Sequence, residues 1–207
     1  RLVANKDIMF SYYGAKTKLS HLYPVPKHGR IIEPFAGSAR YSLLHYGHDI
    51  TLYDANPVIV DIWKHLLEAS ANDIRSLPDI ESKRSLDEIA SLTITERALI
   101  GFHLCRGKSK PRKVGHGQNG WNRDKHRIAD NLWKIKHWSV ALANWNDIDP
   151  LGIIQATWFI DPPYQQTQVK TNGDRYPYGD DIDYQALGEW CQNRAGQAIV
   201  CEGEGAD

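Results

Sequence analysis

The residues best suited to carry out chemistry are Asp161-Pro162-Pro163-Tyr164, which directly follow the apolar run at 156–160. That run predicts a buried strand, and the carboxyl end of a strand is where open α/β sheets place their chemistry. Asp161 could accept one N–H of an exocyclic amino group and the carbonyl of Pro162 the other, which would localise the nitrogen lone pair. The prolines fix φ and direct that carbonyl outward, and Tyr164 offers a face on which a flipped-out base can stack. The structural alternative is an aspartate that caps a polyproline turn.

A second set of residues has the spacing of a cofactor site. Gly37, in EPFAGSAR, comes at a predicted strand-to-helix turn, where a small residue lets a ligand approach the backbone. Asp54 ends the next predicted strand 17 residues later, where an acid can accept hydrogen bonds from both hydroxyls of a ribose. The G-x-G-x-x-G fingerprint is absent and one glycine cannot cradle a pyrophosphate, so we expect S-adenosylmethionine (SAM) rather than NAD or FAD. A glycine turn and a strand-end acid without any cofactor form the structural alternative.

The elements that must position these residues alternate between strand and helix. We expect strands at 30–36 and 49–54, a helix at 38–46 and another that begins at Asn56-Pro57, with an apolar face towards the core. Later strands are expected within 139–145, 153–160 and 198–201, with a helix at 184–193. This rhythm predicts an α/β fold with a mostly parallel, doubly wound sheet.

The middle of the chain departs from that rhythm. Periodicity predicts a mostly helical segment at 85–105, a loop rich in glycine and basic residues at 106–123, and then a helix that carries Ile128, Leu132 and Ile135. We expect Trp133 and Trp138 to be core residues. Between 101 and 137 there are ten Lys and Arg residues against two acids, Asp124 and Asp130, although the formal net charge of the chain is zero. That local excess predicts a polyanion-binding surface, and a merely solvated basic face is the alternative.

Composition and the remaining patterns exclude several classes of protein. The chain of 207 residues is 42% hydrophobic and 24% charged, which is typical of a globular protein. No apolar run is long enough to span a membrane, and residues 1–6 carry no signal-peptide core, so we expect a cytoplasmic protein without a membrane partner. The three cysteines are far apart and show no zinc-like spacing, so we expect free thiols and no metal.

Together the motifs resemble those of the Dam-like (alpha-group) DNA adenine-N6 methyltransferases, in the family's order and over most of the chain. YYGAK (12–16) is similar to the family's N-terminal SAM segment, and EPFAGSA (33–39) to its SAM-binding turn. LYDANPVIV (52–60) is similar to the segment with the ribose-binding acid, and DPPY (161–164) to the catalytic motif. The resemblance implies a Rossmann-like, SAM-dependent methyltransferase fold. Residues 1–70 and 138–207 would form the catalytic domain, and 71–137 an inserted, mainly helical target-recognition region.

The resemblance also implies roles for individual residues and a partner, double-stranded DNA. Catalysis would fall to Asp161, Pro162, Pro163 and Tyr164. The residues expected to bind SAM are Tyr12, Gly14, Lys16, Glu33, Phe35, Ala36, Gly37, Ser38, Asp54, Asp147 and Asp161. The residues expected to contact DNA are Arg106, Lys108, Lys110, Arg112, Lys113, Arg123 and Lys125. The stretch 165–181 would be a lid over the flipped base or, alternatively, a disordered loop. The protein would act as a monomer or weak dimer in a bacterial cell or, as a phage protein, in its host.

Three departures from the family pattern limit what can be carried over. Ala15 replaces the second glycine of the N-terminal motif, and the basic loop lacks the family's usual recognition residues, so no target sequence follows. The sequence ends at Asp207, just after the fifth predicted strand, where the family normally continues with a helix and a β-hairpin. The alternatives are methylation of cytosine N4, methylation of adenine in RNA, or a catalytically impaired DNA-binding short form.

Overall fold

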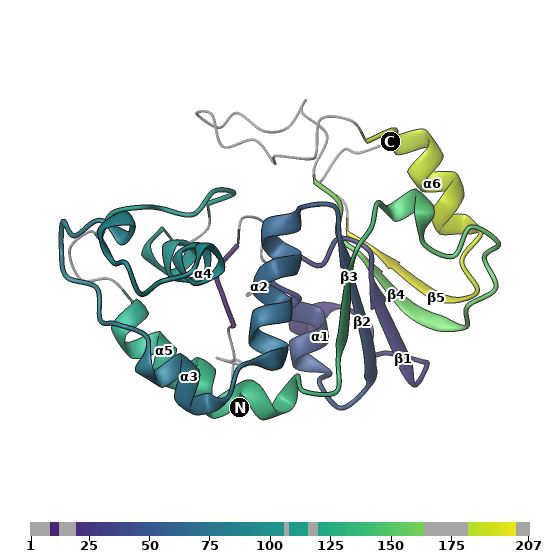
Figure 1. Ribbon diagram of the computed structural model, residues 1–207. Helices are drawn as coiled ribbons and strands as arrows, with labels where there is room; N and C mark the ends of the chain where they lie inside the picture. Colours follow the sequence, from purple (N-terminus) through teal and green to yellow (C-terminus); the bar gives the residue numbers. More distant parts are fainter. Residues whose placement is uncertain (1–8, 13–19, 106–107, 116–119, 164–181, 202–207) are drawn as a thin grey trace.

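The computed structural model describes residues 9–12, 20–105, 108–115, 120–163 and 182–201. Within these residues five strands, all parallel, form one sheet in the order β3-β2-β1-β4-β5. The strands are β1 (Arg30–Glu33), β2 (Asp49–Asp54), β3 (Ser139–Leu142), β4 (Ala156–Ile160) and β5 (Gly196–Val200). The chain winds outward from β1 to β3 and then returns to β4, so the winding reverses between β1 and β4 (Figure 1). Doubly wound sheets form their ligand crevice at such a reversal. The predicted α/β fold with a parallel sheet is confirmed.

Helices cover both faces of this sheet (Figure 1). The helices α1 (Arg40–Leu44) and α2 (Pro57–Glu68) lie on one face, and α6 (Tyr184–Gln192) lies on the other. One cluster of buried apolar side chains fills the space between the sheet and α2, and a second cluster lies between β4 and α6. All five residues of β4 are buried, as its unbroken apolar sequence predicts.

The start of α2 follows directly from its sequence. The side chain of Asn56 accepts a hydrogen bond from the amide of Val58 at 3.0 Å, which caps the helix. Pro57 occupies the first turn, where its missing N–H costs no hydrogen bond. Ile59, Ile62, Trp63 and Leu66 are buried along one face, as predicted from their spacing.

A group of helices follows α2 and lies on the side of α2 away from the sheet (Figure 1). It consists of α3 (Ala71–Ser76), the 3-10 turn η2 (Leu86–Glu88), α4 (Ile94–Leu104), α5 (Trp121–Asn131) and the 3-10 turn η3 (Leu132–Lys134). Phe102 of α4 and Trp121 of α5 belong to the same buried cluster as Trp63 of α2. The predicted boundary near residue 70 therefore divides the sequence without dividing the hydrophobic core.

Several predicted boundaries in this part of the chain are wrong by a few residues. The helix expected across 85–105 begins only at Ile94, because Thr93 caps α4 in a capping box with Glu96. The loop expected across 106–123 ends earlier, because α5 begins at Trp121. The first helix spans only Arg40–Leu44 instead of 38–46.

Trp133 corrects a prediction about the core, because its side chain is 61% exposed. The chain tightens into the 3-10 turn η3 after α5, and residues three apart share a face in such a turn. Leu132 and Ile135 therefore point inward and Trp133 points outward, where its ring packs edge-on against Tyr46. Trp138 is buried, as predicted.

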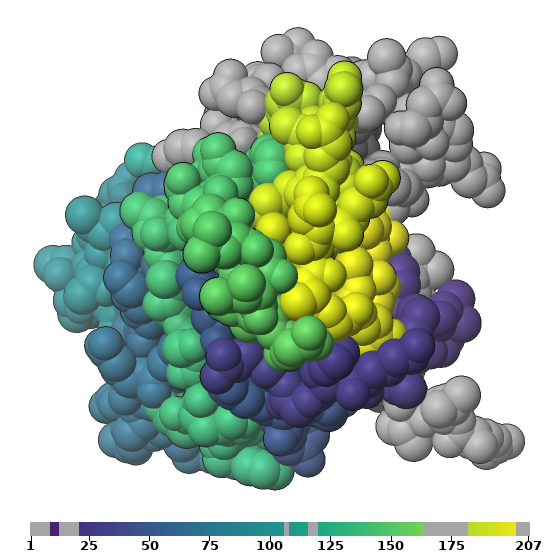
Figure 2. Space-filling view, turned by 90° about the vertical axis from the view of Figure 1, so that its right-hand side faces the viewer, coloured from purple at the N-terminus to yellow at the C-terminus, as the bar shows by residue number. Residues whose placement is uncertain are grey.

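The segment before β4 is fastened to the end of α6. Figure 2 shows the two segments, in green and yellow, lying side by side on one face of the molecule. Arg194 forms a buried ion pair with Asp149 at 3.3 Å and donates to the carbonyl of Trp190 at 3.0 Å. Its guanidinium also lies over the Trp190 ring, 4.2 Å from the centroid. These contacts fix the loop that carries the 3-10 turn η4 (Trp145–Asp147) against the β4–α6–β5 unit.

Among the described residues, no helix combines the length and the apolar character that a membrane span requires.

Candidate active site

Three acidic side chains come to one edge of the sheet, at the carboxyl ends of neighbouring strands. Glu33 is the last residue of β1, Asp54 is the last residue of β2, and Asp161 directly follows β4. Because β1 lies between β2 and β4 and both pairings are parallel, these ends lie side by side at the upper edge of the sheet (Figure 1). The residues predicted for SAM binding and those predicted for catalysis therefore share one edge.

Asp54 holds the turn after β1 to the end of β2. The amide of Gly37 donates to Oδ2 of Asp54 at 2.9 Å, and the amide of Asn56 donates to Oδ1 at 2.8 Å. The amide of Ala36 also donates to the carbonyl of Tyr53 at 2.9 Å. A carboxylate oxygen can accept two hydrogen bonds and each oxygen of Asp54 accepts one amide, so Asp54 keeps acceptor capacity for a ligand.

Gly37 is required by its own backbone and by a close neighbour. Its φ is +45°, a left-handed conformation that favours glycine. A Cβ at this position would lie 3.1 Å from Cδ1 of Tyr12, and the indole N–H of Trp63 donates to the Gly37 carbonyl at 2.9 Å. The ring of Tyr12 thus packs against the turn, which brings two of the predicted SAM-binding residues together.

Burial raises the pKa of both polar side chains beside this turn. It raises the pKa of Asp54 to about 6, although the amides of Gly37 and Asn56 favour the charged form. Burial and the charge of Asp54 raise the pKa of Tyr12 above its ordinary value, against an opposing hydrogen bond with Asn56. Tyr12 therefore stays neutral, and Asp54 would gain from additional hydrogen-bond donors.

Glu33 caps the helix that follows the turn. Its side chain is buried, and Oε1 accepts a hydrogen bond from the amide of Ser42 at 2.8 Å. This contact supplies the cap that Ala39, the residue before α1, has no side chain to provide. Burial raises the pKa of Glu33 to about 8, hydrogen bonding from Ser42 opposes the shift, and the charge of Asp161 adds to it.

The residues after β4 are fixed from two sides. The amide of Cys201, at the end of β5, donates to the carbonyl of Ile160 at 2.8 Å. The hydroxyl of Tyr184, the first residue of α6, donates to the carbonyl of Pro163 at 2.5 Å. Within the described part of the chain, the carbonyl of Pro162 accepts no hydrogen bond, so its acceptor role stays a prediction that these contacts leave open.

Sequence reasoning missed Tyr184, and it had no signal by which to find it. The hydroxyl reaches back across 21 residues to Pro163, and no local pattern encodes such a contact. The distance along the chain explains the omission.

The remaining residues predicted to bind SAM differ in how far they are buried. Ala36 and Ser38 are buried in the turn, and Phe35 is half-buried against the cluster between β4 and α6. Asp147 is exposed at the end of η4, which follows β3. Gly14, Lys16 and Tyr164 lie outside the described residues, as does the predicted lid at 165–181.

No family assignment comes from comparison with other proteins. No protein-family model matches the chain, and no curated protein matches it. The function must therefore be argued from the geometry of the site.

The predicted DNA-contacting residues that the structure describes lie in the part of the chain between α4 and the middle of α5. The segment 108–115 packs closely on α4, because Gly101 has no Cβ and the carbonyl of Arg112 would lie only 2.5 Å from one. Backbone hydrogen bonds also join this segment to residues 83–86. Lys108, Lys110, Arg112 and Lys113 are exposed along it, and Lys113 is 3.3 Å from Asp87. Arg106 lies outside the described residues.

Lys125 is not available to DNA, and we withdraw it from the predicted set. Its side chain is buried, and Nζ lies 2.7 Å from both the carbonyl of Leu77 and the carboxylate of Asp79. Its ammonium therefore ties α5 to the end of α3. Arg123 remains exposed, with an ion pair to Asp124 at 3.1 Å.

Two further basic residues, which lie before the basic segment 101–137 in the sequence, are exposed beside it. Lys83 and Arg84 are exposed, and backbone hydrogen bonds of 2.9 Å connect each of them to Gly115. They lie more than twenty residues before the basic loop at 106–123, so a count along the sequence does not associate them with it.

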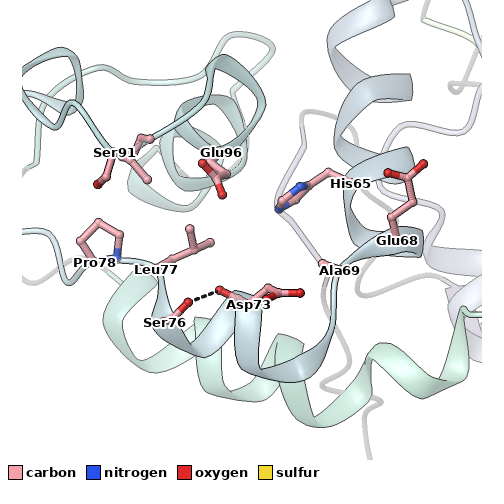
Figure 3. A pocket seen from close by; sticks show the side chains of 10 residues that line it. His65, Glu68, Ala69, Asp73, Ser76, Leu77, Pro78, Ser91 and Glu96 are labelled. Carbon is pink, nitrogen blue, oxygen red and sulfur yellow. Dashed lines mark hydrogen bonds between the residues drawn. The ribbon is translucent and has the colours of Figure 1, made fainter.

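A pocket of about 530 Å³ lies among α2, α3 and the start of α4, away from the strand ends (Figure 3). His65 and Glu96 point into it from opposite sides, and Asp73 and Leu77 line its floor. Asp73 and Glu96 already accept backbone hydrogen bonds in the capping boxes of α3 and α4. None of the residues predicted for catalysis or SAM binding lines this pocket, so it is separate from the candidate active site.

Proposed function

We propose that this chain is a SAM-dependent DNA methyltransferase that acts on the exocyclic N6 of adenine in duplex DNA. The proposal rests on one juxtaposition: Asp161-Pro162-Pro163 at the end of β4 lies beside the Gly37–Asp54 turn of β1 and β2. The first set suits an amino group, and the second suits a ribose-bearing cofactor. Methyl transfer requires the amino group and the methyl donor to lie next to each other in the right orientation.

The residues around the turn fit SAM. Asp54 accepts one amide at each oxygen and retains lone pairs for two ribose hydroxyls. Its raised pKa indicates that the two amides do not fully compensate its burial, so further donors would be favourable. Bound SAM would supply a methyl group already activated by the sulfonium charge.

The chain's own contribution would be to hold and orient the acceptor. The carboxylate of Asp161 would accept one N–H of the adenine amino group, and the carbonyl of Pro162 would accept the other. These contacts would direct the nitrogen lone pair towards the methyl group, so that positioning and charge placement lower the barrier. The bond from Tyr184 to Pro163 would keep the two-proline segment in place.

The basic residues would bring duplex DNA to this site. Lys110 and Arg112, with Lys83 and Arg84, present charge from a segment that backbone bonds hold in position. Phosphate contacts of this kind give affinity without sequence information. The target base would leave the duplex to reach the strand ends, as in other enzymes that modify bases.

The deciding experiment combines isotopically labelled SAM with unmethylated duplex DNA, followed by digestion to nucleosides and mass spectrometry. We expect labelled N6-methyldeoxyadenosine with the parent chain and none with Asp161→Ala. Asp61→Ala is the matched control, because Asp61 is an exposed aspartate of α2 on the same chain.

Each other outcome has a distinct meaning. N4-methylcytosine would move the reaction to the other exocyclic amine, and product only from an RNA substrate would replace DNA by RNA. Absence of product in a chain that binds SAM and DNA would support an impaired DNA-binding form. Absence of SAM binding would overturn the proposal.

A further inference from the structure

A buried polar cluster joins the segment 9–12 to α4 and α5. His103 of α4 and Asp124 of α5 are each 2% exposed, and Nδ1 of His103 lies 3.5 Å from Oδ2 of Asp124. The other ring nitrogen, Nε2, lies 3.2 Å from the carbonyl of Met9. The Met9 carbonyl and the Asp124 carboxylate can only accept hydrogen bonds, so both contacts are satisfied when Nδ1 and Nε2 each carry a proton. His103 thus bridges α4, in the 71–137 region, and the segment 9–12 that leads to Tyr12.

At its outer end the cluster reaches the surface through arginine. Oδ1 of Asp124 is 3.1 Å from Arg123 and 3.0 Å from Arg127, and the side chain of Arg123 is 71% exposed. Burial alone would raise the pKa of Asp124, but hydrogen bonds from His103 and Arg123 and the charges of Arg127 and His103 lower it to about 2. Asp124 is therefore a carboxylate shared between His103 inside and two arginines outside.

At its inner end the cluster reaches the predicted SAM site. Phe102, the neighbour of His103 in α4, contacts the ring of Tyr12 edge-on at 5.5 Å between centroids. Tyr12 in turn packs against Gly37. Two consecutive residues of α4 therefore hold the segment 9–12 at two points, one on the Met9 backbone and one on the Tyr12 ring.

We infer that His103 is a positioning residue that couples DNA binding to SAM binding through the contacts Arg123–Asp124–His103–Met9. The inference rests on the proposed function. A DNA phosphate competes with Asp124 for Arg123, because both are anions that pair with a guanidinium. Asp124 then loses one of its outer partners and interacts more strongly with His103. That strengthens the hold on Met9 and on the Tyr12 contact with the cofactor turn, so DNA should tighten SAM binding.

The test measures the affinity of the full chain for S-adenosylhomocysteine, the unreactive product, by calorimetry with and without saturating unmethylated duplex DNA. We expect DNA to tighten binding about five-fold or more in the parent chain. His103→Gln keeps a donor for Met9 but loses the contact with Asp124, so the ratio should fall towards one while binding without DNA persists. Arg123→Gln should reduce the ratio as well, and its exposed side chain makes loss of the fold no concern.

His126→Gln is the matched control, because His126 is exposed on α5 and should leave the ratio at its parent value. Coupling is reciprocal, so the ligand should change DNA affinity by the same factor. The inference is overturned if the parent chain binds both ligands and the ratio is unchanged in His103→Gln and Arg123→Gln. A loss of affinity that is equal with and without DNA would also overturn it, because it would reveal a merely structural role. A parent chain that binds neither ligand overturns the proposed function and, with it, the coupling.

Discussion

The buried carboxylate of Glu33 accepts a hydrogen bond from the amide of Ser42 at 2.8 Å, so an acid at the end of β1 caps α1. A carboxylate near a helix N-terminus is favourable, yet burial opposes its charge. The balance raises the pKa of Glu33 to about 8, and the charge of Asp161 contributes to the rise. The candidate active site therefore contains an acid that is mostly protonated at neutral pH.

This shift predicts that stability depends on pH through Glu33. In the unfolded chain the pKa of Glu33 lies near the ordinary glutamate value of 4.5. Between about pH 4.5 and 8, Glu33 therefore binds more protons in the folded state than in the unfolded state. The contribution of Glu33 to stability therefore falls as pH rises through this window. We expect Glu33→Gln, which retains an acceptor for Ser42, to lose this dependence and to be more stable than the parent at pH 8.5. Urea denaturation at pH 5.5, 7 and 8.5 measures the difference.

Glu68→Gln is the matched control, because Glu68 is exposed at the end of α2. Its pH dependence should be that of the parent. Parallel stability curves for the parent and Glu33→Gln across the three pH values would contradict the assignment.

A second prediction concerns Gly37. Alanine at this position must adopt φ near +45° and place its Cβ 3.1 Å from the Tyr12 ring. We expect Gly37→Ala to destabilise the fold by about 1–2 kcal/mol and to weaken SAM binding, because both the turn and Tyr12 must shift. Denaturant unfolding and calorimetric SAM titration measure the two effects.

Gly47→Ala provides the comparison, since a Cβ at Gly47 would meet nothing within 4 Å. It should leave both stability and SAM affinity nearly unchanged. Equal behaviour of the two variants would show that the Gly37 turn tolerates a side chain and needs no glycine.

The sequence was sufficient for the framework of the fold because the relevant signals are local. The unbroken apolar run at 156–160 predicts a buried strand, and Asn56-Pro57 predicts a helix start, each from only a few residues. The strand ends at Asp54 and Asp161 followed from the same patterns, and parallel pairing brought them to one edge. The expected strand-helix alternation was therefore enough to group the candidate site.

Contacts between distant segments could not be found in this way. Lys125 counted as a basic surface residue in sequence, yet its ammonium is buried against Leu77 and Asp79, more than forty residues away. His103 lies in the otherwise apolar second half of α4, and nothing near it in sequence identifies Asp124 or Met9 as its neighbours. Trp133 shows a different limit, because a change from α to 3-10 geometry rotates the exposed face.

A third prediction separates the two kinds of basic residue. Lys110→Gln should weaken DNA binding and reduce the slope of log affinity against log salt by about 0.9, the value for one phosphate contact. Lys125→Gln should leave that slope unchanged but destabilise the fold by about 1–3 kcal/mol, because the Leu77 carbonyl loses its buried donor. Fluorescence anisotropy across a salt series and urea denaturation distinguish these effects. Lys64→Gln, at an exposed position of α2, serves as the control. If Lys110→Gln changes the salt slope no more than Lys64→Gln does, Lys110 does not belong to the DNA interface.

A fourth prediction concerns the hydrogen bond from Tyr184 to the carbonyl of Pro163. Tyr184→Phe keeps the ring but removes the donor, so the two-proline segment loses one of its two supports. We expect methyl transfer to slow by roughly five- to ten-fold, equivalent to about 1 kcal/mol. SAM affinity should be unchanged, because the hydroxyl donates to Pro163 while the amides of Gly37 and Asn56 hold Asp54. Single-turnover methylation and SAM titration give the two quantities. Tyr46→Phe, beyond the end of α1, should alter neither. If Tyr184→Phe lowers SAM affinity as much as it lowers the rate, the hydroxyl supports the whole edge of the sheet instead of the segment that holds the amino group.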